Sequence, residues 1–293
     1  MSSLKALKIR INSVKSTQKI TKAMKMVAAA KLRRAQEAAV ASRPYAERLE
    51  AVVSSIASKV DRNGQAHRLL VGTGKEDVHL FVVSTSDKGL AGAFNTNIVR
   101  LARKQADALK AQGKTVKFYT IGRKGRDQLN RTFRTDMVHG IEPGDLGKLT
   151  FTDVQGYAHD LTARFEAGEF DVAHLFFSKF VSVLTQEPMQ IQLMPVAVSD
   201  SGAASTGASA AVEYEPDEEE ILADLLPRNV AVQLLRAQRE NAASEQGSKM
   251  TAMDNATRNA GDMINRLTIQ YNRTRQAAIT TELVEIISGA EAL

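Results

Sequence analysis

The sequence contains no cysteine and no tryptophan, and aromatic residues make up only 5% of its 293 residues. The lack of cysteine excludes a disulfide framework, a thiolate metal site and a cysteine nucleophile. Few aromatic residues favour packing of helix on helix over a large β-sandwich. No apolar run approaches the roughly 18 residues that cross a bilayer, and no apolar segment follows the basic N-terminus as in a signal peptide. We therefore expect a soluble protein rich in packed helices.

Positive charge is concentrated in the N-terminal part of the chain. Residues 1–43 contain eleven Lys or Arg and a single acid, Glu37, whereas the net charge of the whole chain is +6. Such a segment is typical of a protein whose partner is a polyanion: nucleic acid, acidic lipid or an acidic protein surface. Nucleic-acid modules usually interleave aromatic side chains for base stacking, and residues 1–44 have none. We therefore favour an acidic protein partner for part of these charges and solvent for the rest.

Both ends of the chain show the repeat of long helices. The N-terminal pattern predicts a helix over about residues 3–56, with a kink or break at Pro44. The C-terminal pattern predicts a helix over about 228–288, with helix already before Pro227 and a bend or restart there. Helices about 80–90 Å long do not fit inside a compact domain, so we expect them to form an antiparallel coiled coil. The predicted seam residues are Leu4, Leu7, Ile11, Val14, Ile20, Met24 and Val27 at one end, and Met253, Ala256, Ala260, Met263, Leu267, Tyr271, Thr274 and Ala278 at the other.

The middle of the chain alternates between strand and helix patterns. Apolar runs predict strands over 78–85, 115–121, 170–177 and within 189–198, with helices over about 94–112 and 151–167. Near-continuous apolar strands that alternate with helices indicate a mostly parallel sheet. The predicted fold class is therefore mixed α+β, with a central Rossmann-like α/β domain and a long antiparallel coiled coil. The predicted parts are an N-terminal coiled-coil helix at 1–58, the α/β domain at 76–198, a Gly/Ser/Ala-rich linker at 199–212 and a C-terminal coiled-coil helix at 213–293.

Two glycine-containing segments resemble nucleotide-binding loops and fail in detail. Residues 72–75 (GTGK) lack the Gly that a phosphate-binding loop needs at Leu69 and the Ser or Thr that it needs at Glu76. Residues 86–92 (SDKGLAG) follow a strand, as in doubly wound folds, but lack the third glycine of the dinucleotide fingerprint. No catalytic dyad stands out, and the five histidines lack the spacing of a metal site. We predict no catalytic residue, no cofactor and no metal ion.

Four segments of the sequence resemble ATP synthase gamma subunits. Residues 16–28 (STQKITKAMKMVA) are similar to the N-terminal signature of that family, and residues 271–283 (YNRTRQAAITTEL) to its C-terminal signature. Residues 86–90 (SDKGL) resemble the family's turn after the first strand, and residues 214–216 (YEP) resemble its foot motif. The segments follow the family's order along the whole chain, and both terminal motifs are long and specific.

The resemblance implies a mechanical role without an active site. In the family, the terminal helices form an asymmetric antiparallel coiled coil inside a ring of alpha and beta subunits. The α/β domain lies at the foot, against the epsilon subunit and the ring of membrane c subunits. Proton flow turns the c ring, and the shaft drives each beta subunit through its catalytic states. The implied location is peripheral to the membrane, on the cytoplasmic face of the bacterial inner membrane or the matrix side in mitochondria, and no nucleic acid is implied as a partner.

The resemblance also implies contact residues. Those implied to contact the beta subunits are Lys22, Met24, Lys25, Lys249, Arg275, Gln276, Thr280 and Glu282, and those implied to touch the c ring are Tyr214 and Glu215. Lys249 stands where the family commonly has Arg, so it keeps the charge and loses the bidentate fork. The small and apolar residues 286–290 suit a shaft tip that turns in a hydrophobic collar, because apolar contacts are non-directional.

Two other functions stay open from the residues alone. The basic N-terminal segment is compatible with a coiled-coil nucleic-acid-binding protein, which would lose DNA binding steeply as salt is added. The central sheet is compatible with a nucleotide-binding α/β enzyme, which would bind ATP or NAD saturably.

Overall fold

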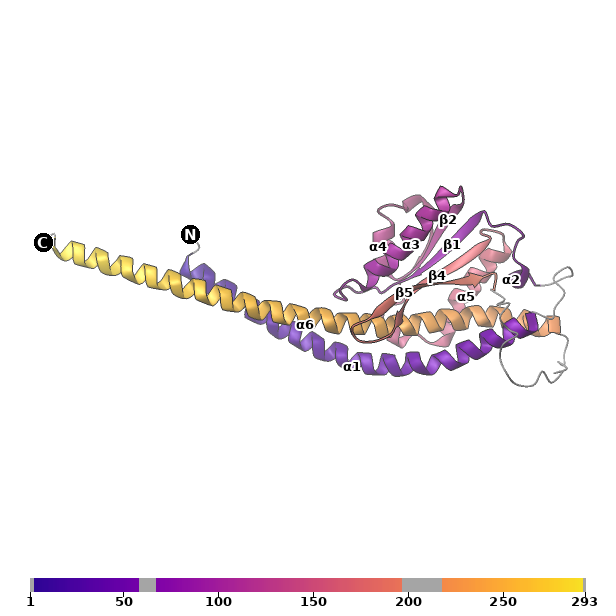
Figure 1. The fold of residues 1–293 in the computed structure, drawn as a ribbon, viewed down its shortest axis with the longest axis horizontal. Coiled ribbons are helices and arrows are strands. Elements are labelled where there is room, and N and C mark those ends of the chain that lie inside the picture. Colours follow the sequence, from indigo (N-terminus) through magenta and orange to yellow (C-terminus); the bar gives the residue numbers. More distant parts are fainter. Residues whose placement is uncertain (1–2, 58–66, 197–217, 292–293) are drawn as a thin grey trace. The chain divides into compact units, whose positions relative to one another are not determined.

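The computed structural model describes residues 3–57, 67–196 and 218–291 (Figure 1). The predicted linker at 199–212 and the predicted c-ring residues Tyr214 and Glu215 lie outside the described residues. The described residues divide into two compact units, one within 1–29 and 249–293 and the other within 30–248. In chain order the elements are α1 (Leu4–Ala57), α2 (Arg68–Val71), β1 (Val78–Ser84), α3 (Phe94–Ala111), β2 (Thr115–Ile121), α4 (Arg123–Leu129), η1 (Arg134–Asp136), β3 (Met137–Ile141), η2 (Leu146–Lys148), α5 (Phe151–Glu166), β4 (Val172–Phe180), β5 (Gln186–Met194) and α6 (Glu218–Glu291).

In the first unit, the N-terminal part of α1 pairs with the C-terminal part of α6. The Lys25 ammonium lies 2.5 Å from the Asp254 carboxylate, and the hydroxyl oxygens of Thr21 and Thr257 lie 2.8 Å apart. The apolar seam residues nearer the N-terminus are Leu7, Ile11 and Leu267, with Val14 and Tyr271 packed against them. From Leu7 to Lys25 the residue numbers rise along α1, while those of the contacting residues fall along α6 from Leu267 to Asp254. The predicted antiparallel pair is therefore confirmed.

The seam itself differs from the prediction in part. Ile20 and Val27 are 59% and 58% exposed, and Met263 is also exposed, so their assignment to the seam was wrong. Thr21 and Ala28 are buried instead. A step of seven residues returns to the same helix face within about 20°, and Thr21 and Ala28 continue that step. The larger apolar residues, one position earlier, point elsewhere.

Both long helices run through a proline without interruption. A break at Pro44 and a restart at Pro227 are wrong, because each proline lies inside its helix, whereas the alternatives of a kink at Pro44 and a bend at Pro227 stay predictions. An internal proline costs about 3 kcal/mol, since one backbone hydrogen bond is lost and the ring crowds the preceding turn. Next to these prolines, Ala46, Leu226 and Val230 are fully buried. Tertiary burial of the flanking turns offsets the local cost.

The second unit contains a five-stranded sheet in the order β3-β2-β1-β4-β5. The first four strands are parallel, and β5 is antiparallel to β4. The mostly parallel sheet was predicted, and the strand at β3 was missed. Its five residues are only half-buried or exposed and include a glycine, so they lack the apolar run that marks the central strands.

Helices cover both faces of this sheet (Figure 1). Alternate residues of a strand point to opposite faces, so β1 sends Phe81 and Val83 to one side and Leu80 and Val82 to the other. The first face packs against α3 and α4. The second packs against α5 together with the parts of α1 and α6 that belong to this unit. The two long helices are therefore part of the domain core.

Asp171, just before β4, ties the loop ahead of β1 to the sheet. Its carboxylate accepts hydrogen bonds from the Thr73 hydroxyl (2.6 Å) and from the backbone N–H groups of Asp77 (3.0 Å) and Val78 (2.9 Å). Partial burial acts to raise the pKa of Asp171, but the three hydrogen bonds outweigh it and lower the pKa below its usual value. Thr73 belongs to segment 72–75, so the apparent phosphate-binding loop has a structural use.

Cysteines in place of Thr21 and Thr257 should form a disulfide when the purified chain is mildly oxidised. The contact of the two hydroxyls brings their Cβ atoms close to the about 3.5–4.5 Å that a disulfide needs. The native sequence contains no competing cysteine. Peptide mapping without reductant measures the product. The control pair is Thr17→Cys with Thr257→Cys, because Thr17 is exposed one turn away. Equal yields from both pairs would contradict the antiparallel register.

Replacing Asp171 by Asn should lower the free energy of unfolding by about 1–3 kcal/mol at neutral pH, because hydrogen bonds to a charged acceptor are lost. The folded pKa is lowered, so this stabilisation is present above the usual pKa of 3.8 and is lost as the pH falls through the folded value. The gap between variant and wild type should therefore narrow towards acid pH in urea titrations. Asp107→Asn, on an exposed position of α3, is the control and should change little.

Candidate functional site

The first unit, formed by residues within 1–29 and 249–293 and here named the helical unit, has both apolar and basic side chains exposed on its surface. The exposed apolar residues are Ile9, Ile20, Met26 and Val27 on α1, and Met263, Ile269, Ile279, Leu283, Val284, Ile286 and Ile287 on α6. Scattered apolar residues are normal on a surface, but a series along one helix pair marks a protein contact. Three of them, Ile20, Met26 and Val27, lie in the segment with the N-terminal signature. Sequence reasoning missed them as surface groups because it placed Ile20 and Val27 in the seam.

Basic side chains share this surface. Residues 3–29 contain Lys and Arg but no acid. Across the described part of the chain, Lys25 is the one basic side chain of this segment that forms an ion pair, with Asp254. The hydrogen bond from Lys25 lowers the pKa of Asp254 below its usual value. The remaining cations have no acidic neighbour on their own helix, so they are available to an acidic partner surface.

The residues implied for beta-subunit contact fall into two groups along the helix pair. The first is Lys22, Met24, Lys25 and Lys249, of which Lys22 is exposed and the other three are half-buried. A cavity of about 580 Å³ beside this group is lined by Gln18, Lys19, Lys22, Lys25, Met26, Ala29, Met250, Asp254 and Thr257. The ion pair of Lys25 was not foreseen, and it leaves Lys22 as the freer cation of the two.

The second group is Arg275, Gln276, Thr280 and Glu282, all exposed on the last turns of α6. Arg275 lies 18 residues beyond Thr257, which is about 27 Å along a helix, so the structure does not bring the two groups together. Their surroundings are the exposed apolar residues Ile279 and Leu283. The residues implied for beta-subunit contact therefore form two separate groups, here named the waist (the Lys22 group) and the tip (the Arg275 group).

Hydroxyl groups at the tip are bonded within their own helix. Thr280 donates to the carbonyl oxygen of Gln276 (2.9 Å), and Thr281 donates to that of Ala277 (3.0 Å). These two hydroxyls are therefore satisfied within the helix, while Arg275, Gln276 and Glu282 keep polar groups on the surface of the tip.

The carboxyl end of β1, where doubly wound folds bind ligands, is filled by internal hydrogen bonds. The Asp87 carboxylate accepts from the backbone N–H groups of Arg123 (2.7 Å) and Gly144 (2.5 Å). The Asn95 side-chain oxygen accepts from the Ser86 N–H (3.0 Å). Asp87 therefore holds the start of α4 and the loop at Gly144 together. The polar groups at this end of β1, which a nucleotide would need as hydrogen-bond partners, are occupied by these internal hydrogen bonds.

His79 and His174, on adjacent strands, stack with ring centroids 5.5 Å apart. Nδ1 of His79 lies 3.3 Å from Nε2 of His174, and the two outer nitrogens face the carbonyl of Glu76 and the side chain of Gln190. Burial lowers the pKa of His174 to about 4, with a further contribution from His79. All four ring nitrogens are engaged, so the pair is a neutral part of the sheet.

Within the ranges 3–57, 67–196 and 218–291, no group of three or more His, Asp or Glu side chains is arranged to hold a metal ion. The described helices include none with the length and apolarity needed to cross a membrane.

Solved structures share this fold. A chain of the Euglena gracilis mitochondrial ATP synthase (OSCP/F1/c-ring, rotational state 3) superposes with a TM-score of 0.68, over 99% of this chain and 94% of that chain. Its identity of 19% makes this a likeness of fold alone. The central stalk and c-ring structure of the Tetrahymena thermophila mitochondrial ATP synthase gives a TM-score of 0.62 at 26% identity, over 81% of this chain and 99% of that chain.

Sequence comparison is more specific. Residues 3–293 match the family model described as ATP synthase. The chain is 71% identical to the ATP synthase gamma chain of Rhizorhabdus wittichii and 61% identical to that of Sphingopyxis alaskensis, in each case over the full length of both proteins. With the helix pair, the sheet and the signature segments in agreement with this match, the chain belongs to the ATP synthase family, among its gamma chains.

Proposed function

We propose that this chain is the central rotor shaft of a proton-translocating ATP synthase. The observation that carries the proposal is the helical unit: a long antiparallel pair whose described surface carries basic and apolar side chains. Such a surface is of use only against other proteins. Membership of the gamma chain family supplies the complex in which those proteins are found.

The shaft acts by differential contact. A rigid element that presents a different side to each surrounding subunit stabilises a different conformation in each of them. As the element rotates, each subunit in turn adopts each of these conformations. The pair is uneven, because residues 3–29 of α1 carry several cations and no acid, whereas the facing part of α6 carries acids such as Asp254. In this role the chain is a non-catalytic subunit, and the chemistry of ATP belongs to its partners.

The waist and the tip take different parts in this proposal. The waist presents Lys22 with the half-buried Met24 and Lys249 to acidic segments of the beta subunits. At the tip, Arg275, Gln276, Thr280 and Glu282 contact beta-subunit loops, while the apolar turns around Ile287 rotate in an apolar bearing. Apolar contact has no preferred direction and so allows smooth rotation.

In this proposal the α/β unit meets the epsilon subunit and the c ring, with Tyr214 and Glu215 as the proposed c-ring contacts. The chain is peripheral to the membrane, and we place it on the cytoplasmic face of a bacterial inner membrane. No specific observation favours a nucleic-acid-binding protein or a nucleotide-binding enzyme. The filled end of β1 and the failed motif at 72–75 speak against the enzyme.

Replacing Met24 by Lys should impair coupling more than assembly. The new cation would add to the waist beside Lys22 and would meet acidic beta segments at some rotary angles only. A desolvated charge pair that forms at one rotary angle stabilises the rotor at that angle by about 1–3 kcal/mol. Rotation away from that angle then has to overcome this stabilisation. We expect near-normal assembly and ATP hydrolysis with reduced ATP-driven proton pumping. The measurement is the ratio of pumping to hydrolysis in inverted membrane vesicles.

The control is Met24→Leu, which keeps volume and apolarity without adding charge and should behave as wild type. An unchanged ratio in an intact Met24→Lys complex would show that Met24 does not face an acidic beta segment.

A further inference from the structure

The face of α6 that packs on the sheet near residue 240 is polar, whereas a buried helix face is ordinarily apolar. Its almost fully buried side chains, here named the polar layer, are Gln238, Glu240, Asn241 and Ser244. Buried polar groups need hydrogen-bond partners. Members of the polar layer find partners in α1, β1 and β4, whereas the amide nitrogen of Gln238 has no partner among the described residues.

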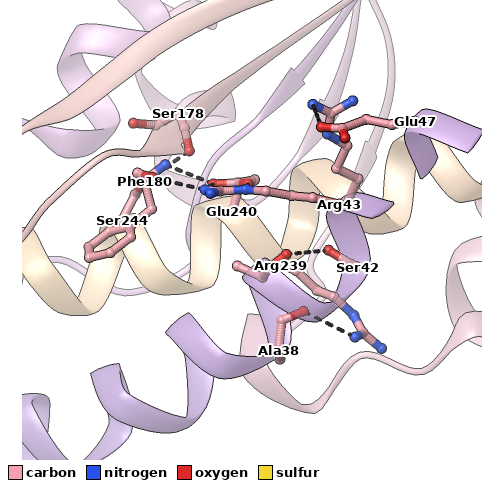
Figure 2. Close-up of polar contacts among 11 residues, drawn as sticks. Ala38, Ser42, Arg43, Glu47, Ser178, Phe180, Arg239, Glu240 and Ser244 are labelled. Atoms are coloured by element: carbon pink, nitrogen blue, oxygen red, sulfur yellow. Dashed lines mark hydrogen bonds and ion pairs between the residues drawn. The ribbon is translucent and has the colours of Figure 1, made fainter. Parts of the chain in front are cut away.

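Glu240 is the centre of the layer. Its side chain is 2% exposed, and its carboxylate accepts hydrogen bonds from Nε (2.6 Å) and Nη2 (3.0 Å) of Arg43 and from the backbone N–H of Phe180 (2.8 Å). Nη2 of Arg43 also donates to the carbonyl oxygen of Phe180 (3.0 Å). One closed set of hydrogen bonds thus joins α1, α6 and β4, and Figure 2 shows Glu240 between the other two residues.

The neighbouring members of the layer fix α6 to the strands. The Ser178 N–H donates to the side-chain oxygen of Asn241 (2.8 Å), and the Ser244 hydroxyl donates to the Ser178 carbonyl (3.0 Å). The Asn241 amide donates to the Ser84 hydroxyl (2.7 Å). These bonds hold α6 at one height on β1 and β4, so α6 and the sheet form one body here.

Between α1 and α6, by contrast, several buried side chains nearest the ion pair are short, and larger ones such as Leu49, Val53 and Leu234 lie further along the helices. The short ones are Ala35, Ala39 and Ala46 on α1, and Ala237, Ala242 and Ala243 on α6. Alanines let two helices approach closely, but they interdigitate little. Packing next to the ion pair therefore offers little resistance to sliding of α1 along α6. The ion pair of Arg43 with Glu240 (2.6 Å) is the shortest of the directional contacts between the two helices in this unit. Others join Arg239 to the Ala38 carbonyl (3.4 Å), Gln233 to Glu50 (3.5 Å) and Arg236 to Glu47 (3.8 Å).

We infer that the ion pair of Arg43 with Glu240 keeps α1 in register with α6 while torque passes along the two helices. The inference rests on the proposed rotor function. Torque on two helices that wind about each other acts as opposite forces along their axes, which tends to slide one past the other. A slip of one residue is about 1.5 Å. That slip breaks hydrogen bonds of 2.6 and 3.0 Å but hardly changes an alanine contact.

The test is the double variant Arg43→Met with Glu240→Gln. It removes both charges together, so no unpaired charge is buried and the fold is retained. The Gln amide oxygen still accepts from the Phe180 N–H. We expect a folded chain and near-normal ATP hydrolysis without load. Against an established proton gradient in vesicles, the ratio of proton pumping to hydrolysis should fall by about twofold or more.

Two further variants separate register from stability. Lys110→Met with Asp136→Asn removes an ion pair of 2.5 Å that joins α3 to η1 in the same unit and involves neither long helix. It should leave the pumping ratio unchanged. Arg43→Lys keeps the charge without the bidentate fork, so its ratio should lie between those of wild type and the double variant. A merely structural role would shift the thermal midpoint of these variants and leave the pumping ratio alone.

The outcomes distinguish the inference from the function on which it rests. If wild type pumps and the double variant pumps equally well under load, the register role is wrong. If the wild-type chain, assembled with alpha and beta subunits, supports no coupled pumping, the proposed function is wrong. Should the double variant fail to fold, Arg43→Lys decides the matter, and an unchanged ratio under load overturns the inference.

Discussion

A carboxylate buried as deeply as that of Glu240 has to be neutralised and hydrogen-bonded, and this requirement organises the larger unit. Removing one partner of such a pair typically costs about 3–5 kcal/mol, because the other charge is left unpaired. Arg43 and the backbone at Phe180 meet the requirement together, so α1 and β4 are held wherever Glu240 is held. The sheet, which would otherwise only rest on two helices, becomes attached to both.

The two units have different mechanical requirements, rigidity in the larger unit and free rotation at the tip of the smaller one, and they meet them with different kinds of contact. The larger one uses directional polar contacts, from Asp171 at the start of the sheet to Asn241 on α6, and is thereby fixed in register. Towards the tip, hydroxyls such as that of Thr280 are turned back onto their own helix. Directional contacts resist displacement and apolar contacts permit it. A part that has to be rigid along its length and free to turn in its bearing needs both.

Much of this could be predicted from the sequence, because period and composition act locally. The long helices, the alternation of strands and helices and the lack of a phosphate loop at 72–75 all follow from residues close in the chain. The seam at Ile20 and Val27 was wrong because its register depends on the partner helix. Continuity through Pro44 depends on tertiary burial, and the pairing of Lys25 with Asp254 joins residues far apart in sequence. Single-sequence patterns carry no such long-range information.

The sheet order has a consequence for the chain before assembly. The outermost strands, β3 and β5, expose backbone groups that could recruit a strand from another molecule. Pro188 lies within β5, and proline has no N–H to offer a further neighbour. Glu187 beside it adds a charge to the same edge. This edge of the sheet is thus protected against pairing with the same edge of a second copy of the chain.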